Sequence, residues 1–138
     1  MKKILTVGVY DMLHIGHVLL FKHIKEMFSD EPCELIVAVQ DGDFILKYKP
    51  DTHIVYSTEE RMFMVSSVRW VDKVVTYRDV DADIRDIDFD VFAKGPDQQH
   101  PGFQRAVAWC RENGKKVVVI PRTEGISSTF LKNYSRDR

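Results

Sequence analysis

Short apolar runs alternate with helix-like segments from one end of this chain to the other. Runs with the length of buried strands lie at 3–9, 34–39, 73–76, 89–93 and 116–120. Segments with helical spacing of apolar residues, or with helix start and stop signals, lie at 16–28, 44–46, 57–70, 80–87, 103–112 and 127–134. This order predicts an α/β fold, doubly wound, whose mainly parallel five-stranded sheet carries helices on both faces. We expect residues 1–138 to form a single domain.

The predicted fold also says where a ligand site should lie. In doubly wound sheets, ligands bind beyond the carboxyl ends of the strands, where the strand order reverses. The loops that follow predicted strands, and should therefore gather at this edge, are Tyr10–His17, Gln40–Lys49, Lys94–Asp97 and Pro121–Ser128. Chemically reactive residues in these loops are the first candidates for a shared site.

Composition argues against several classes of partner. A formal net charge of −1 does not favour broad electrostatic capture of nucleic acid or of an anionic membrane. No segment approaches the roughly 20 apolar residues that a membrane span needs. Cys33 and Cys110 form no CxxC pair and have no metal-ligand spacing, as is usual in a reduced chain. We therefore expect a cytoplasmic protein that binds neither nucleic acid nor membrane.

His14 and His17 flank Gly16 at a predicted strand-to-helix turn. The first backbone N–H groups of a helix lack internal partners and, together with the helix dipole, they attract phosphates. The histidines have two other interpretations, a metal pair or caps of the helix. A third metal ligand with suitable spacing is not evident in the sequence, so no metal site is predicted. A phosphate site explains the pair best, because Gly16 leaves room for a phosphate to approach the backbone.

Several segments, in the same order and at the same spacing, resemble one enzyme family. Asp11–His17 resembles the HxGH signature of the nucleotidyltransferase superfamily, and Arg122–Ser128 resembles the RTEGIS motif of its cytidylyltransferase branch. Glu59–Arg61 with Val68–Val75, and Phe92–Asp97, resemble two further segments of that family. The resemblance to the cytidylyltransferase family spans nearly the whole chain and implies a Rossmann-like fold.

The resemblance implies roles for particular residues. The catalytic residues would be His14, His17, Lys47 and Arg122. The histidines would donate to α- and β-phosphate oxygens, Arg122 would neutralise phosphates, and Lys47 would bridge acceptor and nucleotide. The nucleotide would be bound by Gly8, Val9, Tyr10, Gly16, Asp97, Thr123, Gly125, Ile126, Ser127 and Ser128. The acceptor or the phosphates would be contacted by Asp11, Lys49, Arg61, Arg69 and Lys94.

Some of these assignments have open alternatives. Lys49 rivals Lys47 as the bridging lysine, and Asp11 either orients a histidine or places the acceptor. Lys94 is either solvated or adds positive charge near an anionic acceptor. The chain also has Val9 and Tyr10 where the family often has Thr or Cys followed by Phe, which leaves the identity of the acceptor open.

Two pairs of residues keep a structural interpretation beside a functional one. For Arg61 and Arg69 the alternative to phosphate binding is a surface salt bridge. For Phe63 and Trp70 burial in the core is favoured over a place in a subunit interface, although the resemblance implies a homodimer.

By the same resemblance, a phosphomonoester oxygen attacks the α-phosphorus of CTP, releasing pyrophosphate and giving a CDP-alcohol. Such a reaction needs mainly positioning and stabilisation of charge on phosphoryl oxygens. The expected partners are CTP and a small phosphomonoester, glycerol 3-phosphate first, with Mg²⁺ as a cofactor held mainly by phosphates and water. The alternatives are another acceptor (phosphoethanolamine, phosphocholine or a sugar phosphate), adenylyl transfer from ATP, or a nucleotide-binding module without turnover.

Overall fold

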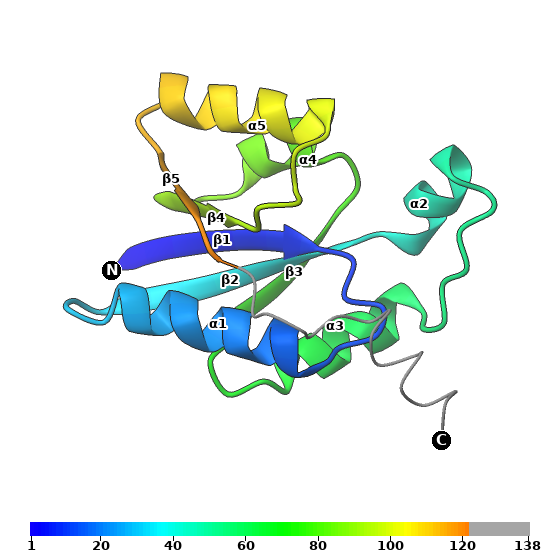
Figure 1. Ribbon diagram of the computed structural model, residues 1–138, viewed down its shortest axis with the longest axis horizontal. Helices are drawn as coiled ribbons and strands as arrows, with labels where there is room; N and C mark the ends of the chain where they lie inside the picture. The colour runs from blue at the N-terminus through cyan, green and yellow to red at the C-terminus, as the bar shows by residue number, and fades with distance from the viewer. Residues whose placement is uncertain (122–138) are drawn as a thin grey trace.

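A computed structural model describes residues 1–121, and its strands and helices alternate as the sequence predicts. The sheet has five strands in the order β3-β2-β1-β4-β5 (Figure 1). These strands are β1 (Lys2–Gly8), β2 (Cys33–Gln40), β3 (Lys73–Tyr77), β4 (Val91–Lys94) and β5 (Lys116–Val119). All neighbouring strands are parallel, which confirms the predicted sheet and makes it parallel throughout the described residues.

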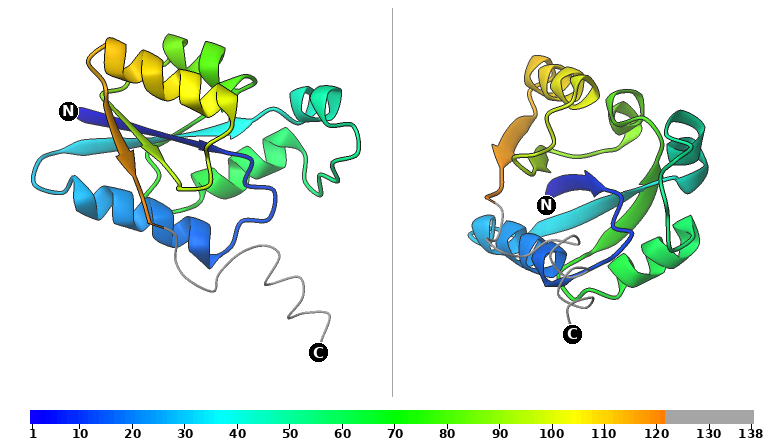
Figure 2. Two further views of the ribbon diagram at one scale, coloured as in Figure 1. Left: turned by 45° about the horizontal axis from the view of Figure 1, so that its top comes forward. Right: turned by 45° about the vertical axis from the view of Figure 1, so that its right-hand side comes forward.

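Helices cover both faces of this sheet, as predicted. Helices α1 (Ile15–Met27) and α3 (Thr58–Ser66) lie on one face, and α4 (Val80–Asp83) and α5 (Pro101–Glu112) lie on the other (Figures 1 and 2). Helix α2 (Gly42–Tyr48) stands beyond the carboxyl ends of the strands. The predicted helix at 80–87 is shorter than expected, because α4 tightens into a 3₁₀ turn, η1 (Ile84–Asp86).

Local chemistry fixes the ends of several helices. At the start of α3, the Ser57 hydroxyl accepts from the Glu60 N–H at 3.1 Å, and the Glu60 carboxylate accepts from the Ser57 N–H at 2.9 Å. This reciprocal capping box satisfies N–H groups that a helix leaves without partners. At the end of α5, the chain turns through Gly114 at φ +71°, a conformation that glycine adopts without strain. The sequence predicts both signals.

Alternate strand residues supply two hydrophobic cores, one on each face. Ile4 packs with Phe21 and Ile24 of α1. Leu5 packs on the opposite face, with Phe103 and Ala106 of α5. Burial on both faces explains why the central strands are apolar at consecutive positions.

The strand order places the topological switch point between β1 and β4. β1 pairs with β2 along its whole length, but its pairing with β4 is limited to Ile4 with Val91 and Leu5 with Phe92. Beyond these pairs β1 and β4 separate, at the edge where doubly wound sheets bind ligands.

The structure corrects one of the two aromatic placements on α3 and the segment after it. Phe63 is 73% exposed, so the predicted core burial of this residue is wrong. Trp70 packs against the core beside α1 as expected. The difference is one of helical phase, because Phe63 lies on the outer face of α3 while Val65 lies on its buried face.

Within residues 1–121, no helix has the length and apolarity to cross a membrane. The predicted helix at 127–134 lies outside the described residues.

Candidate active site

The turn between β1 and α1 is held by two imidazoles. His14 is the N-cap of α1, and its Nδ1 accepts the Gly16 N–H at 3.0 Å. In return, the Nδ1 of His17 accepts the main-chain N–H of His14 at 3.2 Å. The two histidines therefore form a capping box, in which imidazole nitrogens take the places of the usual hydroxyl and carboxylate oxygens. The helix-cap interpretation of these residues is confirmed.

This cap determines what the histidines offer a ligand. Because each Nδ1 accepts a hydrogen bond, each neutral ring carries its proton on Nε2 and is a donor there. The two rings stack with centroids 4.0 Å apart and planes 30° apart, so each ring supports the position of the other. A pair of N–H donors at the start of a helix is well suited to anionic oxygens. The cap and the phosphate site are therefore compatible, since they use different nitrogens of the same rings.

His17 remains neutral over the physiological pH range. Burial, and then the nearby charge of His14, lower the pKa of His17 from 6.5 to about 4. Burial has this effect because it disfavours the charged imidazolium. His17 therefore donates as a neutral imidazole and carries no positive charge of its own at pH 7.

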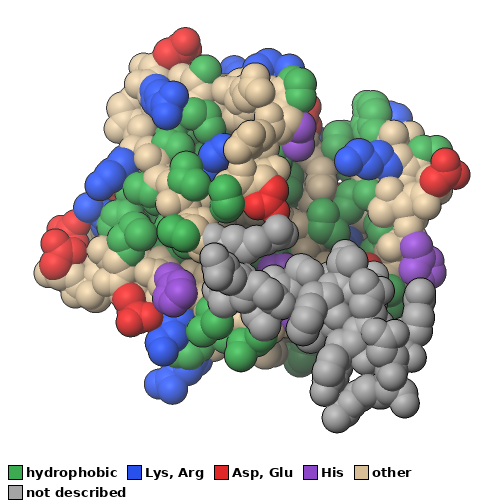
Figure 3. Space-filling model, in the orientation of Figure 1, with side chains coloured by type: hydrophobic (Ala, Val, Ile, Leu, Met, Phe, Trp, Pro, Cys, Tyr) green, Lys and Arg blue, Asp and Glu red, His purple; other side chains and the backbone are tan. Residues whose placement is uncertain are grey.

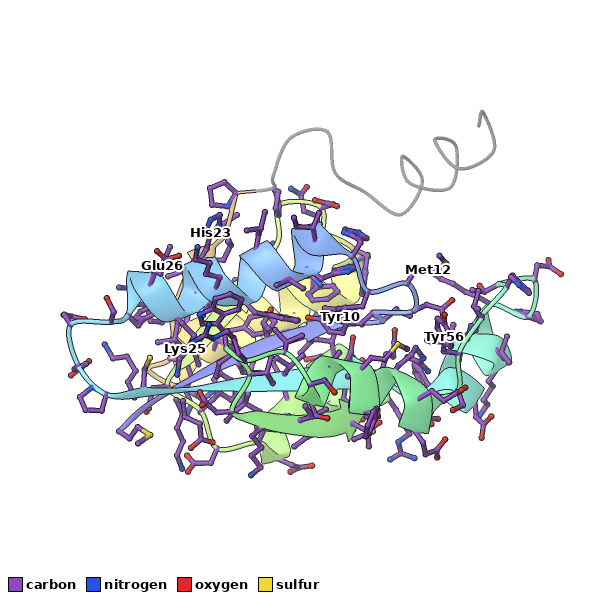
Figure 4. All side chains as sticks on the ribbon, turned by 90° about the horizontal axis from the view of Figure 1, so that it is seen from below. Tyr10, Met12, His23, Lys25, Glu26 and Tyr56 are labelled. Carbon is purple, nitrogen blue, oxygen red and sulfur yellow. The ribbon has the colours of Figure 1, made fainter. Side chains whose placement is uncertain are left out.

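Tyr10 packs directly beneath this pair. It has φ 54° and is only 5% exposed, and its ring meets His17 edge-on at 5.3 Å and Phe21 at 5.5 Å. Figure 4 shows Tyr10 between the start of α1 and the sheet. A Cβ added at Gly8 would lie 2.7 Å from the Tyr10 ring, so the bare backbone of Gly8 makes room for that ring. Gly8 thus has a packing role, and its predicted nucleotide contact stays a prediction.

The Tyr10 hydroxyl is buried and makes no hydrogen bond of good geometry with the described residues, although the nearby Thr6 side chain partly offsets the effect of burial on its pKa. Burial raises the pKa of Tyr10, which keeps the phenol neutral. Tyr10 accordingly supports His17 through its ring, and the predicted contact with a nucleotide would have to come from its backbone.

Arg61 is the clearest correction to the sequence-based assignments. Its side chain is fully buried, so the predicted surface salt bridge is wrong. Its Nη1 donates to the carbonyl oxygens of Val9 at 2.9 Å and Gln40 at 2.7 Å, and its Nε donates to the carbonyl oxygen of Tyr56 at 3.2 Å. Nη2 donates to the Thr58 hydroxyl. Arg61 thus ties the ends of β1 and β2 to the start of α3, instead of presenting its charge to a phosphate.

Asp11 also holds backbone in place. Its carboxylate accepts the N–H groups of Val55 at 2.8 Å and Tyr56 at 2.9 Å. Asp11 thus clamps the segment before α3, while its expected roles, orienting a histidine or placing the acceptor, stay predictions. Figure 4 shows Met12 and Tyr56 at the same end of the molecule. Together with Arg61, Asp11 fixes the loop that carries His14 and His17.

Gln98, which the sequence analysis missed, fills the gap between β1 and β4. Its Nε2 donates to the carbonyl oxygen of Val7 at 2.9 Å, and its Oε1 accepts the Gly95 N–H at 3.0 Å. Lys94 donates from Nζ to the Gln98 carbonyl oxygen at 2.9 Å, so it is not simply solvated, and its expected charge near an acceptor stays a prediction. A side-chain amide thus takes the place of a missing strand partner, and no pattern in the sequence indicates it.

The remaining predicted residues fall into three groups. Lys47 and Lys49 are exposed at the end of α2, beyond the carboxyl ends of the strands, where a ligand can reach them. Asp97 is exposed in the loop after β4. Arg69 follows α3 and precedes β3, so it lies toward the edge where the strands begin, with its guanidinium 5.5 Å from the Trp70 ring centre. The structure therefore does not bring Arg69 to His14 and His17.

Part of the predicted site lies outside the described residues. This part comprises Arg122, Thr123, Gly125, Ile126, Ser127 and Ser128. Within residues 1–121, no group of three or more His, Cys, Asp or Glu side chains is arranged to hold a metal ion. The described site is thus a pair of imidazole N–H donors at the switch point, with the exposed Lys47 and Lys49 beyond the same ends of the strands.

Comparison with known proteins places this chain in a family. A family model described as cytidylyltransferase-like matches residues 5–133. The glycerol-3-phosphate cytidylyltransferase of Bacillus subtilis (strain 168) is 33% identical over 135 residues, covering 96% of this chain and 95% of that protein. The Staphylococcus aureus (strain NCTC 8325 / PS 47) enzyme of the same name is 34% identical over 143 residues, covering 99% of this chain and 98% of that protein.

Other similarities are partial or concern the fold alone. The bifunctional protein HldE of Coxiella burnetii (strain RSA 493 / Nine Mile phase I) is 32% identical over 130 residues, which cover 93% of this chain and 26% of HldE. The crystal structure of the lipopolysaccharide core biosynthesis protein from Thermoplasma volcanium GSS1 superimposes with a TM-score of 0.67 at 20% identity, covering 89% of this chain and 97% of that one. That similarity confirms the Rossmann-like fold.

Proposed function

Because this chain belongs to the cytidylyltransferase-like family, we propose that it transfers the cytidylyl group of CTP to glycerol 3-phosphate, producing CDP-glycerol and pyrophosphate. The observation that carries this proposal is the similarity, over nearly the full length of both chains, to two bacterial enzymes named for that acceptor. The geometry at the start of α1 is consistent with it, since phosphoryl transfer requires N–H donors aimed at phosphate oxygens.

In this reaction, an oxygen of the acceptor phosphate forms a bond to the α-phosphorus of CTP. The bond from the α-phosphorus to the oxygen that leads to the β-phosphorus breaks, and its electrons leave with pyrophosphate. His14 and His17 would donate from Nε2 to the oxygens on which charge accumulates. A pair of rings preorganised by a helix cap needs no rearrangement to do so, and preorganised donors are an effective source of transition-state stabilisation.

Other residues would serve the same step. We propose that Arg122 neutralises the triphosphate, and that Ser127, Ser128 and the neighbouring N–H groups hold its outer phosphates, by similarity to the RTEGIS motif. Lys47 or Lys49 would bridge the acceptor phosphate and the nucleotide from the end of α2.

Mg²⁺ would enter with the triphosphate. Within residues 1–121 no three His, Cys, Asp or Glu side chains are grouped to hold an ion, and the Asp11 carboxylate already accepts two main-chain N–H groups. That donor set fits an ion coordinated mainly by phosphate oxygens and water, as Mg²⁺ commonly is at nucleotide sites. The ion would supply charge neutralisation on the phosphates. The predicted homodimer and cytoplasmic location stay predictions.

The proposal is tested by pyrophosphate release with purified protein, Mg²⁺ and a panel of nucleotides and phosphomonoesters. We expect turnover with CTP and glycerol 3-phosphate, and a product with the mass of CDP-glycerol. Turnover with phosphoethanolamine, phosphocholine or a sugar phosphate instead would replace the acceptor, and turnover with ATP would replace the donor. CTP binding by calorimetry without pyrophosphate release under any acceptor would identify a binding module and refute the proposal.

A further inference from the structure

A histidine N-cap like the one at the start of α1 also occurs at the start of α5. His100 is the N-cap of α5, and its Nδ1 accepts the Gly102 N–H at 3.1 Å, just as the Nδ1 of His14 accepts the Gly16 N–H at 3.0 Å. Each capping histidine is followed by one residue and then glycine. Each also contacts an aromatic ring at the next position, His17 in α1 and Phe103 in α5, the latter at 4.5 Å.

The cap fixes the chemistry of His100. A Cβ added at Gly102 would lie 2.9 Å from the Cε1 of His100, so the imidazole lies over the bare backbone of that glycine. Because Nδ1 accepts a hydrogen bond from the helix, the neutral ring carries its proton on Nε2. The side chain is exposed, and its Nε2–H is therefore a donor available to a ligand.

His100 lies on the other side of the switch point from His14 and His17. β1 leads into α1 and β4 leads into α5, and these two strands separate beyond Leu5 and Phe92. The loop that ends at His100 is anchored to the end of β1 by the Gln98 side chain, which donates to the Val7 carbonyl oxygen at 2.9 Å. The two imidazole caps thus stand at the two helices that flank the place where this fold binds ligands.

A lysine contributes positive charge to the same region. Burial, and then the charges of Lys49 and Arg105, lower the pKa of His100, while Asp79 opposes them. Lys49 comes from the segment after α2, and Figure 3 shows the surface hollowed between the side of the molecule that carries α5 and the side that carries α2. An imidazole N–H donor with positive charge nearby favours an anion over a cation.

The in-line geometry of phosphoryl transfer suggests which anion binds on the α5 side. In phosphoryl transfer the attacking and leaving oxygens are roughly in line, on opposite sides of the reacting phosphorus. If His14 and His17 hold the α- and β-phosphates from the α1 side, the acceptor has to approach from another side. The α5 side carries His100.

We propose that His100 is a ligand of the acceptor's phosphate group, to which it donates from Nε2. This inference rests on the proposed function and adds to it a residue that determines acceptor affinity.

The test uses the variant His100→Asn. Asparagine is a good N-cap, so His100→Asn keeps the helix start and removes only the imidazole donor. We expect His100→Asn to raise the KM for the acceptor by about 10-fold or more, as the loss of a hydrogen bond to a charged group predicts, and to leave the KM for CTP within about twofold. His23→Asn is the matched control, because His23 is exposed on α1 away from the strand ends (Figure 4).

A binding measurement keeps the inference independent of turnover. In the wild-type protein, the imidazole NMR signals that disappear in His100→Asn should shift on titration with glycerol 3-phosphate, and those of His23 should not. An acceptor KM unchanged in His100→Asn, a rise in the KM for CTP instead, or an unshifted His100 signal would overturn the inference. If the wild-type enzyme turns over no phosphomonoester, the proposed function fails, while the titration still shows whether His100 binds a phosphate ester.

Discussion

His17 stacks on His14 with ring centroids 4.0 Å apart, and its Nδ1 accepts the main-chain N–H of His14. The two residues that we propose as donors in the reaction are thus the same two that cap the start of α1. Under this proposal, stability and catalysis are linked at this turn, but through different ring nitrogens. Substitutions that keep one function and remove the other can separate them.

The first prediction concerns catalysis. His14→Asn and His17→Gln should keep the cap, because asparagine is a good N-cap and glutamine is the usual partner in a capping box. Each should nevertheless lower kcat by on the order of 10² or more, since a transition-state donor is lost. Steady-state kinetics together with thermal unfolding test this. Near-wild-type kcat in either variant would exclude that histidine as a donor, and His23→Asn serves as the control.

The second prediction concerns pH. The pKa of His17 is lowered to about 4 in the folded protein, whereas an unfolded histidine titrates near 6.5, so between these values the unfolded chain binds more protons. The stability that His17 contributes is therefore fully present above about pH 6.5 and is lost as the pH falls toward 4, by up to about 2–3 kcal/mol. Denaturant unfolding at a series of pH values measures this. His17→Gln should flatten the slope, and an equally steep slope in that variant would assign the effect to other groups.

The third prediction concerns Arg61. Its removal by Arg61→Ala would leave the carbonyl oxygens of Val9, Gln40 and Tyr56 without their donor in a buried place. We expect a loss of about 3 kcal/mol or more in unfolding free energy, with a smaller loss for Arg61→Lys, because the ammonium can still reach one or two carbonyls. Arg111→Ala, at an exposed position of α5, should change stability by less than about 0.5 kcal/mol. A comparable loss in both variants would contradict the structural role.

The fourth prediction concerns the Tyr10 hydroxyl. Because this buried group makes no hydrogen bond of good geometry with the described residues, Tyr10→Phe should leave stability unchanged or raise it by about 1–2 kcal/mol. The ring contacts with His17 and Phe21 remain, so kcat should stay close to that of the wild type. Thermal unfolding and kinetics decide this. A clear loss of stability would mean that the hydroxyl has a partner.

The fifth prediction concerns Arg122. If this residue neutralises the triphosphate, Arg122→Ala should raise the Kd for CTP by about 10-fold or more, as expected for a lost charged contact. Calorimetric titration with CTP measures the Kd directly, with Arg111→Ala as the control. An unchanged Kd would remove Arg122 from the nucleotide site.

Local sequence patterns were sufficient for the elements and for the motif that carries the chemistry. The capping box at Ser57 and Glu60 and the turn at Gly114 depend on residues close in the chain, so their physical causes can be identified without a fold. His14, Gly16 and His17 are likewise neighbours in sequence, and the position of their loop at a strand's carboxyl end follows from the alternation of strands and helices.

Residues whose environment comes from distant segments were predicted poorly. Arg61 belongs to a motif that suggests a phosphate ligand. Its side chain instead donates to the carbonyl oxygens of Val9 and Gln40, which lie 52 and 21 positions away. Gln98 binds Val7 across 91 positions. Asp11 accepts N–H groups 44 and 45 positions away. A repeated His-x-Gly at 14–16 and 100–102 was visible in the sequence, and it gained meaning only when both histidines proved to be helix caps.

The sequence by itself therefore determined which segments are strands and helices, the parallel doubly wound class of the sheet, and the family motif at its edge, because these depend on periodicity and on contacts within a few residues. The tertiary structure alone decided the strand order β3-β2-β1-β4-β5, the burial of Arg61, and the position of α5, which His100 caps, across the switch point from α1. Those features depend on pairings between remote segments, whose free energies no local pattern contains.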